Sequence, residues 1–166
     1  MGAMEDLQAA FAGESQANRK YLAFAKKADE EGHPQIAKLF RATAQAETVH
    51  ALSHFDVMGG VKDTSANLKT AIDGEGYEFK EMYPKFVADA EKEKNEPALA
   101  TFKHALAVEM IHHGLYTGAL NSLNSGKDLP KAPIFVCGVC GNTVLSVAPA
   151  ICPVCGAPRT KFSEVK

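Results

Sequence analysis

One pattern of acidic and imidazole side chains occurs twice in this chain and constrains its fold more than any other feature. In each copy, a lone glutamate is followed 33 or 34 residues later by a Glu-x-x-His pair. The residues are Glu14 with Glu47 and His50, and Glu75 with Glu109 and His112. Residues three apart on a helix share one face, and a carboxylate on an apolar face is costly unless it is paired or binds a metal. The repeat therefore predicts a two-metal site inside a bundle of helices.

Apolar residues recur at helical spacing through the segments that carry these acids. We predict helices at 4–31, 34–58, 65–94 and 97–124. The third helix breaks local rules, because Gly74 and Gly76 are poor helix formers and Pro84 should kink it. Two shorter helices in place of this long one are the alternative.

The two helical hairpins place their acids at matching heights. The first set lies 19 residues before and 14 residues after His33, and the second lies 20 before and 14 after Asn95. Glu78, one helical turn after Glu75, adds a fifth carboxylate. Oxygen and nitrogen ligands without a thiolate suit iron or manganese, and ligand softness alone leaves zinc open.

The four cysteines form two Cys-x-x-Cys pairs near the end of the chain. They are Cys137, Cys140, Cys152 and Cys155. Such pairs can wrap one tetrahedral ion, and their spacing alone slightly favours structural zinc over iron. We predict a helical domain at 1–124, a polar linker at 125–133 and a small metal domain at 134–166, which is too short to build a core without its cysteines.

Charge and hydropathy exclude several classes of protein. A formal net charge of −2 gives no broad basic field, which argues against a nucleic-acid partner. No stretch reaches the roughly 18 apolar residues of a membrane span. The beginning of the sequence also lacks the charged and apolar segments of a secretion signal. We therefore expect a cytoplasmic protein that does not bind membranes.

Taken together, these features resemble those of a rubrerythrin over about residues 4–166. The motifs that carry the resemblance are the two Glu-x-x-His pairs with their lone glutamates, Glu78 running on to Glu81-Met82-Tyr83-Pro84, and the two Cys-x-x-Cys-Gly sequences. The resemblance implies an all-α ferritin-like four-helix bundle that binds two non-haem irons, followed by a rubredoxin-like domain. It also favours iron at the four cysteines, where zinc can substitute.

The resemblance implies a role for each ligand. Glu47 and Glu109 would bridge both irons, Glu14 and Glu75 would be terminal ligands, His112 would hold one iron, and His50 and Glu78 would exchange as ligands of the other. Tyr21 and Tyr83 would donate hydrogen bonds to these carboxylates. The exchange of His50 and Glu78 would explain why the predicted site has five glutamates where a ferritin-like site needs four.

The resemblance also implies a function. We expect a peroxidase that reduces hydrogen peroxide to water, with electrons passed from NAD(P)H through a separate reductase or a rubredoxin to the cysteine-bound iron. One alternative is a ferroxidase or other iron-handling protein. The other is a non-enzymatic metal-binding or sensor protein with structural zinc at its cysteines.

The short link between the second and third helices predicts an oligomer. In the ferritin-like topology these helices run parallel, so the link must travel the length of the bundle. A helix of about 25 residues is about 37 Å long, whereas residues 59–65 stretch over only about 23 Å. We therefore predict a domain-swapped homodimer or higher oligomer. A plain up-down-up-down bundle is the competing arrangement.

Overall fold

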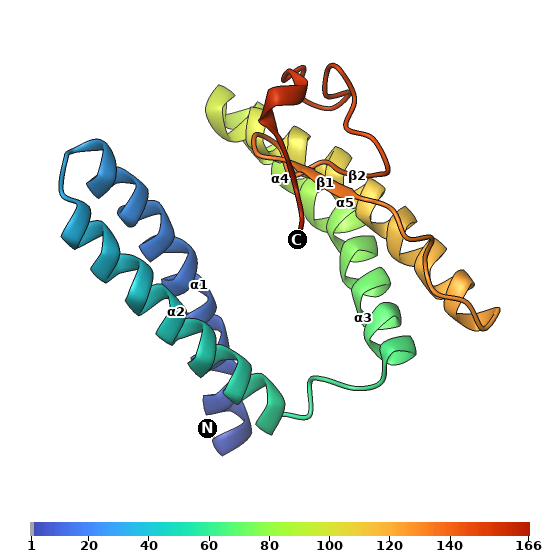
Figure 1. Cartoon of the computed structure of the whole chain (residues 1–166), viewed down its shortest axis with the longest axis horizontal. Helices are drawn as coiled ribbons and strands as arrows, with labels where there is room; N and C mark the ends of the chain where they lie inside the picture. The colour runs from blue at the N-terminus through green and yellow to red at the C-terminus, as the bar shows by residue number, and fades with distance from the viewer. Residues whose placement is uncertain (1) are drawn as a thin grey trace. The chain divides into compact units, whose positions relative to one another are not determined.

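The computed structural model of the chain describes residues 2–166 (Figure 1). The first residue of the predicted helical domain, residue 1, lies outside the described residues. The chain divides into two compact units, Met1–Lys62 and Asp63–Lys166, and each is described here by itself. The predicted domain boundaries at 124 and 133 remain a prediction.

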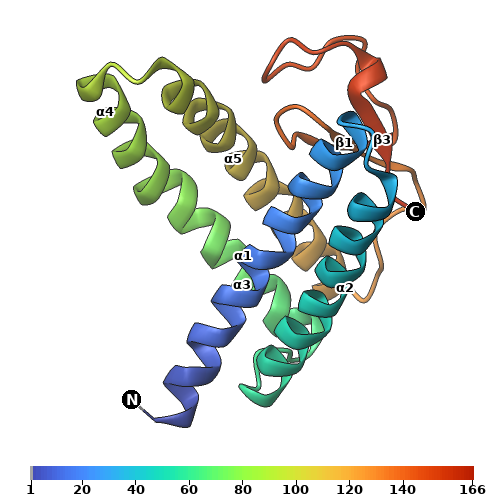
Figure 2. The ribbon, with the colours of Figure 1, turned by 90° about the vertical axis from the view of Figure 1, so that its left-hand side faces the viewer.

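The first unit is an antiparallel pair of helices, α1 (Ala3–Glu30) and α2 (Pro34–Val57) (Figures 1 and 2). Gly32, at φ +79°, turns the chain between them, and Pro34 occupies the first turn of α2, where its missing N–H has no cost. Small side chains let the helices approach closely: Ala25, Ala28, Ala37, Ala44 and Ala51 are all buried. Near the open end, the rings of Phe11 and Phe55 stack 4.9 Å apart.

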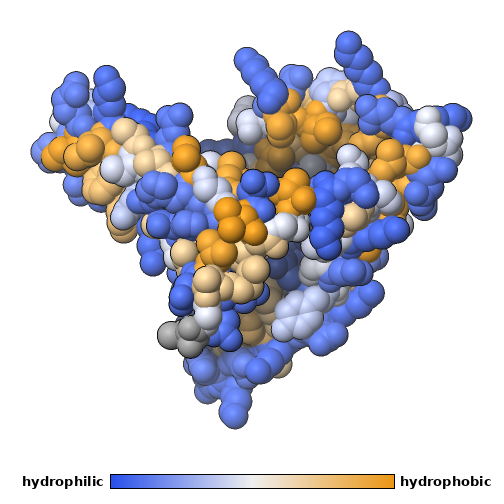
Figure 3. All heavy atoms as spheres, turned by 90° about the horizontal axis from the view of Figure 1, so that it is seen from below, coloured by the Kyte–Doolittle hydropathy of each residue, from blue (hydrophilic) through white to orange (hydrophobic). Residues whose placement is uncertain are grey.

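One side of α2 remains apolar and exposed within the first unit. Ile36, Leu39 and Val57 are 51%, 64% and 68% exposed. At 100° per residue they share this side of the helix with Glu47 and His50. Apolar side chains also gather at the surface in the space-filling view (Figure 3). An exposed apolar surface of this kind marks an interaction site.

The second unit begins with three helical segments and one long helix. They are α3 (Thr64–Tyr77), a π-helical segment (Glu78–Met82), α4 (Tyr83–Glu93) and α5 (Glu96–Asn124). The Asp63 carboxylate caps α3 by accepting a hydrogen bond from the Ala66 N–H at 2.8 Å. The Asn95 side chain caps α5 in the same way, through the N–H of Ala98 at 3.2 Å.

The predicted helix at 65–94 is interrupted by the π-helical segment, and the distortion begins at Glu78, six residues before Pro84. The Tyr83 N–H donates to the carbonyl of Glu78, five residues back instead of four. Pro84 then falls in the first turn of α4, where a backbone N–H is not needed for a helical hydrogen bond. The extra residue per turn therefore accommodates the proline, and π-turns of this kind occur often at functional sites.

The C-terminal part of the second unit is a three-stranded antiparallel sheet. Its strands are β1 (Ile134–Cys137), β2 (Thr143–Leu145) and β3 (Phe162–Glu164), in the order β2-β1-β3. Val136 pairs with Thr143 on one side and with Ser163 on the other. This sheet lies against α5: a Cβ at Gly141 would stand 3.7 Å from Val108, which is buried.

Candidate metal centres

The first hairpin brings Glu14, Glu47 and His50 together, with one donor atom of each within 4.8 Å of the others. His50 Nδ1 lies 3.0 Å from Glu47 Oε2 and 3.9 Å from Glu14 Oε1. Glu47 and His50 meet because they stand one turn apart on α2. Glu14 reaches them from α1 because the hairpin is antiparallel. We call this group the first triad.

Asn18, which the sequence analysis did not single out, holds the two helices together beside the first triad. It is 6% exposed, and its Nδ2 donates to the Ala44 carbonyl at 2.6 Å and lies 2.7 Å from Thr48 Oγ1. Asn18 stands one turn after Glu14, and Thr48 follows Glu47 directly. In the sequence, this role was signalled by a polar residue four positions after the candidate ligand Glu14.

The second unit brings Glu75, Glu109 and His112 together in the same way, which we call the second triad. His112 Nδ1 lies 2.9 Å from Glu109 Oε2 and 3.7 Å from Glu75 Oε2. Glu75 Oε2 is buried, and no hydrogen bond reaches it from the described residues. A buried carboxylate oxygen without a partner is costly unless a cation binds it. The second triad therefore fits a metal ion.

Burial shifts the ionisation of one member of the second triad, Glu75. It raises the pKa of Glu75 from 4.5 to about 7, with a further contribution from the negative charge of Glu109. The glycine after Glu75 lies where α3 packs against α5. Gly76 is buried, and a Cβ there would make an ordinary contact with the His113 ring at 3.5 Å.

Glu78 and Tyr83 belong to the surroundings of the second triad. Glu78 is not among the donor atoms that meet there, but burial and the negative charge of Glu109 raise its pKa. Burial raises the pKa of Tyr83, and the charges of Glu109, Glu78 and Glu75 raise it further. Glu78 therefore starts the π-helical segment within electrostatic reach of the ligands.

The two predicted tyrosine hydrogen bonds are not seen among the described residues. The Tyr21 ring lies 6.3 Å from the rings of Phe24 and Phe40, in an aromatic cluster of the first hairpin. The Tyr83 ring lies 6.3 Å from that of Phe102. Their contact with the ligand carboxylates stays a prediction, as do the individual ligand roles.

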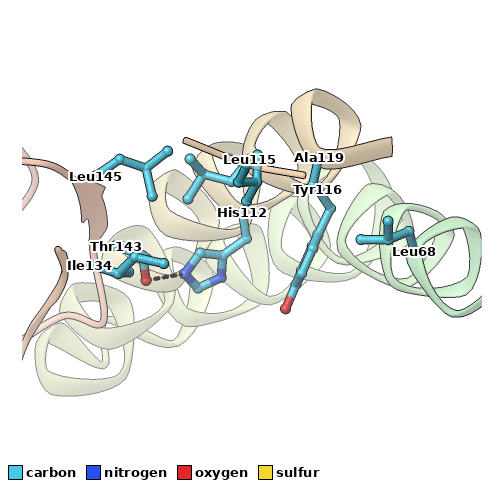
Figure 4. Close-up of a pocket in the computed structure, with 9 residues that line it drawn as sticks. Leu68, His112, Leu115, Tyr116, Ala119, Ile134, Thr143 and Leu145 are labelled. Atoms are coloured by element: carbon cyan, nitrogen blue, oxygen red, sulfur yellow. Dashed lines mark hydrogen bonds between the residues drawn. The ribbon is translucent and has the colours of Figure 1, made fainter. Parts of the chain in front are cut away.

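His112 also has a partner on its outer side. Its Nε2 lies 3.0 Å from Thr143 Oγ1, the first residue of β2 (Figure 4). The imidazole borders an apolar cavity of about 410 Å³ between α3, α5 and the sheet, with Leu68, Leu115 and Ile134 among its walls. Thr143 is 31 residues from His112 in the chain, so no helical or strand spacing could have indicated this contact.

The four cysteines gather at one point, with their sulfur atoms within 4.8 Å of one another. Cys137 Sγ lies 3.8 Å from Cys155 Sγ, and Cys140 Sγ lies 3.6 Å from Cys152 Sγ. A tetrahedral ion with metal–sulfur bonds of about 2.3 Å would separate its ligands by about 3.75 Å. All four cysteines are free thiols. The geometry therefore fits one tetrahedral iron or zinc ion.

Each cysteine pair is folded as the same loop. The N–H of Gly141 donates to the Cys137 carbonyl, and the N–H of Gly156 donates to the Cys152 carbonyl, both at 2.9 Å. Both glycines have positive φ, at +85° and +73°, where a side chain would be strained. The glycine that follows each Cys-x-x-Cys pair is thus part of the metal-binding loop.

Hydrogen bonds prepare one of these thiols for ligation. Burial alone would raise the pKa of Cys152, but donors from Cys155, Val154 and Asn142 outweigh it and lower the pKa to about 6. The Asn142 side chain is buried, with Nδ2 3.6 Å from Cys152 Sγ. By contrast, burial raises the pKa of Cys140 and of Cys155. A bound cation would favour the thiolate form of all four.

None of the helices between residues 2 and 166 combines the length and apolar character needed to cross a membrane.

Two Glu, Glu, His triads on helical hairpins and a four-cysteine sheet domain define the class of protein: a diiron-type carboxylate protein with a rubredoxin-like domain. Two family profiles agree with this class. The rubrerythrin profile matches residues 5–120, and that of the rubrerythrin rubredoxin-like domain matches residues 135–163. The chain belongs to the rubrerythrin family of oxidoreductases.

Relatives along the whole chain support this assignment. Rubrerythrin-2 of Clostridium acetobutylicum is 35% identical, over 94% of this chain and 92% of that protein. Nigerythrin of Nitratidesulfovibrio vulgaris is 36% identical, over 96% and 85%. A solved structure of fully reduced, all-ferrous nigerythrin matches 99% of this chain and 88% of its own, with a TM-score of 0.59 at 32% identity. The predicted family is therefore confirmed, and with it the combination of four-helix and rubredoxin-like parts.

Proposed function

We propose that this protein is a non-haem diiron peroxidase that reduces hydrogen peroxide to water. The observation that carries the proposal is the presence of two equivalent carboxylate and histidine triads in one chain with a four-thiolate site. Two ferrous ions bound by the triads would supply the two electrons for the reaction H2O2 + 2 e⁻ + 2 H⁺ → 2 H2O. The seven predicted ligands, Glu78 included, remain those of the sequence analysis.

The proposal requires the two triads to face one another. The apolar side of α2 that carries Glu47 and His50 is exposed within its own unit, so it needs a partner. That partner would be the helical surface that carries Glu75 and Glu109. The six residues between Val57 and Thr64 reach about 23 Å, whereas the 24 residues of α2 span about 36 Å. This limit favours closure between two subunits in a domain-swapped homodimer.

Residues around the second triad can supply the two protons that peroxide reduction consumes. A carboxyl group whose pKa is raised keeps its proton to higher pH and can act as a proton donor. Burial and the charge of Glu109 raise the pKa of Glu78, whose carboxylate is not part of the second triad. We assign Glu78 to proton delivery when it is not a ligand. Tyr83 would orient the carboxylates by donating a hydrogen bond to them from its hydroxyl group.

The four-cysteine domain would receive the electrons. Val139, between the first two cysteines, is 54% exposed, which gives a donor protein an apolar approach to the thiolates. We expect this donor to be a reductase that uses NAD(P)H, or a small rubredoxin. The buried positions of Cys137 and Cys152 would keep peroxide away from the same site.

A comparison of oxidants tests the proposed function. The iron-loaded chain is reduced without oxygen and mixed with hydrogen peroxide or with oxygen in a stopped-flow instrument. A peroxidase reacts at least about tenfold faster with peroxide and releases only water. Equal or faster oxidation by oxygen, with ferric iron retained as mineral, would instead indicate iron handling.

A metal-binding or sensor protein with structural zinc is the second candidate, because the sulfur geometry fits zinc as well as iron. Expression in iron-rich, zinc-poor medium separates these possibilities. Red protein whose thiolate-to-iron bands bleach with reductant and return with peroxide supports the enzyme. Colourless protein that still selects zinc under these conditions supports the sensor.

A further inference from the structure

The two histidines of the triads are held differently on their outer sides. Each directs Nδ1 at the carboxylates of its own triad, at 3.0 Å for His50 and 2.9 Å for His112. Nε2 of His112 lies 3.0 Å from Thr143 Oγ1, whereas no partner contacts Nε2 of His50 among the described residues of its unit. The His50 side chain is 55% exposed and that of His112 is 25% exposed.

The hydroxyl of Thr143 is arranged to accept a hydrogen bond from the Nε2–H of His112. A threonine hydroxyl has one proton to donate and two lone pairs to accept with. Thr143 Oγ1 donates its hydrogen bond to the Gly141 carbonyl at 3.2 Å. Thr143 Oγ1 is then free to accept from Nε2–H. A metal ligand must offer an unprotonated nitrogen, and a proton held on Nε2 leaves Nδ1 free for a metal between the carboxylates.

We propose that Thr143 is a positioning residue that fixes the ring orientation and the metal-binding tautomer of His112. This inference rests on the proposed function only in taking His112 as a metal ligand. Outer partners of this kind are needed because a single bond to the metal does not set the rotation of the imidazole ring. The proposal makes His112 the histidine whose ring position is fixed from outside the metal site.

The position of Thr143 is set by the four-cysteine loop. Asn142 accepts a backbone hydrogen bond from Cys137 at 2.9 Å, and its buried side chain lies against Cys152. Gly141 packs towards Val108, one turn before His112 on α5. Residues 141–143 therefore run from the cysteine site directly to the second triad of the same chain. Loading of the cysteine site should strengthen the hold on His112 because it rigidifies this loop.

The test replaces Thr143 with valine, which keeps the β-branched shape and removes the hydroxyl, and with serine, which restores it. Thr70→Val, on the exposed surface of α3, is the matched control. The probe is Co²⁺, added to the full chain with zinc already at the four cysteines. We expect Thr143→Val to weaken Co²⁺ binding at the carboxylate site about 10- to 100-fold. Thr143→Ser and Thr70→Val should stay close to the unmodified protein.

Proton NMR of the Co²⁺-loaded protein supplies a readout that a loss of packing would not mimic. The shifted Nε2–H signal of His112 should exchange slowly with water in the unmodified protein and in Thr143→Ser. It should exchange fast in Thr143→Val. Unchanged affinity and an unchanged signal in Thr143→Val would overturn the proposal, as would loss of both in Thr143→Ser. If the unmodified protein binds Co²⁺ as expected but its iron-loaded form does not reduce peroxide, the proposed function is refuted and the role of Thr143 is not.

Discussion

Glu109 Oε2 lies 2.9 Å from Nδ1 of His112, one helical turn along α5. The same contact, at 3.0 Å, joins the corresponding pair of the first hairpin. The two halves of the chain therefore present the same donor set to a metal. Their likeness lies in the spacing of these residues and not in a common stretch of sequence.

This equivalence predicts matching losses of metal. Glu47→Gln and Glu109→Gln should each lose the carboxylate-bound iron while keeping the cysteine-bound iron, because an amide is a much weaker ligand than a carboxylate. Peroxide reduction should fall at least about 100-fold in both. Iron analysis and the thiolate-to-iron absorption measure the two sites separately. Glu30→Gln, on the exposed surface of α1, should change neither, and a variant that retained full iron would contradict the assignment.

Asn18 predicts a stability effect in the first hairpin. Replacing it with alanine removes the hydrogen bonds to Ala44 and Thr48 and leaves a buried carbonyl less well satisfied. The free energy of unfolding should fall by about 1–3 kcal/mol. Urea denaturation followed by circular dichroism measures this change. Gln16→Ala, exposed on the same helix, should lie within about 0.5 kcal/mol of the unmodified protein.

Helical spacing was enough to predict most of the candidate site. Glu47 and His50, and likewise Glu109 and His112, are three apart on amphipathic helices, so their meeting follows from local geometry. Glu14 and Glu75 could be added because each hairpin has a short turn from which depth is counted. The cysteine site was predictable because Cys-x-x-Cys followed by glycine encodes a closed loop.

Contacts that depend on tertiary packing were not predictable in the same way. Pro84 indicated a distortion, but the π-turn starts at Glu78 because the backbone must gain a residue before the proline. Thr143 and His112 belong to elements with no shared periodicity, and they meet only through the packing of the four-cysteine domain against α5. In the sequence Asn18 looks like an ordinary polar helix residue, because its hydrogen bonds depend on the packing of α2 against α1.

The raised pKa of Glu75 predicts how stability depends on pH once the carboxylate-bound metal has been removed. The folded chain binds this proton with a pKa of about 7, compared with 4.5 ordinarily. The folded state therefore holds more protons between these values, and stability must fall as pH rises from about 4.5 to 7. The loss should be about 1–3 kcal/mol. Urea denaturation of unmodified protein and Glu75→Gln at pH 5 and pH 7.5 measures it, and an equal slope in both would disprove the role of Glu75.

The contact between the Asn142 side chain and Cys152 Sγ predicts how the reduction potential of iron at the four cysteines changes when Asn142 is replaced. A hydrogen bond to sulfur favours the more negative, reduced site, so its removal should lower the potential. If the bond is worth about 1 kcal/mol more in the reduced state, Asn142→Leu should lower the potential by about 40 mV. Redox titration of the thiolate-to-iron bands measures the change. Asn121→Ala, exposed on α5, is the control, and a potential that stayed the same or rose in Asn142→Leu would contradict the prediction.

The proposed exchange of hairpins between subunits predicts complementation. In a swapped dimer, each site combines Glu47 of one chain with Glu109 of the other. A dimer of one Glu47→Gln chain and one Glu109→Gln chain then has one doubly damaged site and one intact site. Random mixing by co-expression should restore about a quarter of the carboxylate-bound iron and of the peroxidase activity, and purified mixed dimers about half. A chain that closes its own bundle would restore neither, because every site would keep one substitution. Differently tagged chains, purified in sequence and analysed for iron, decide between the two arrangements.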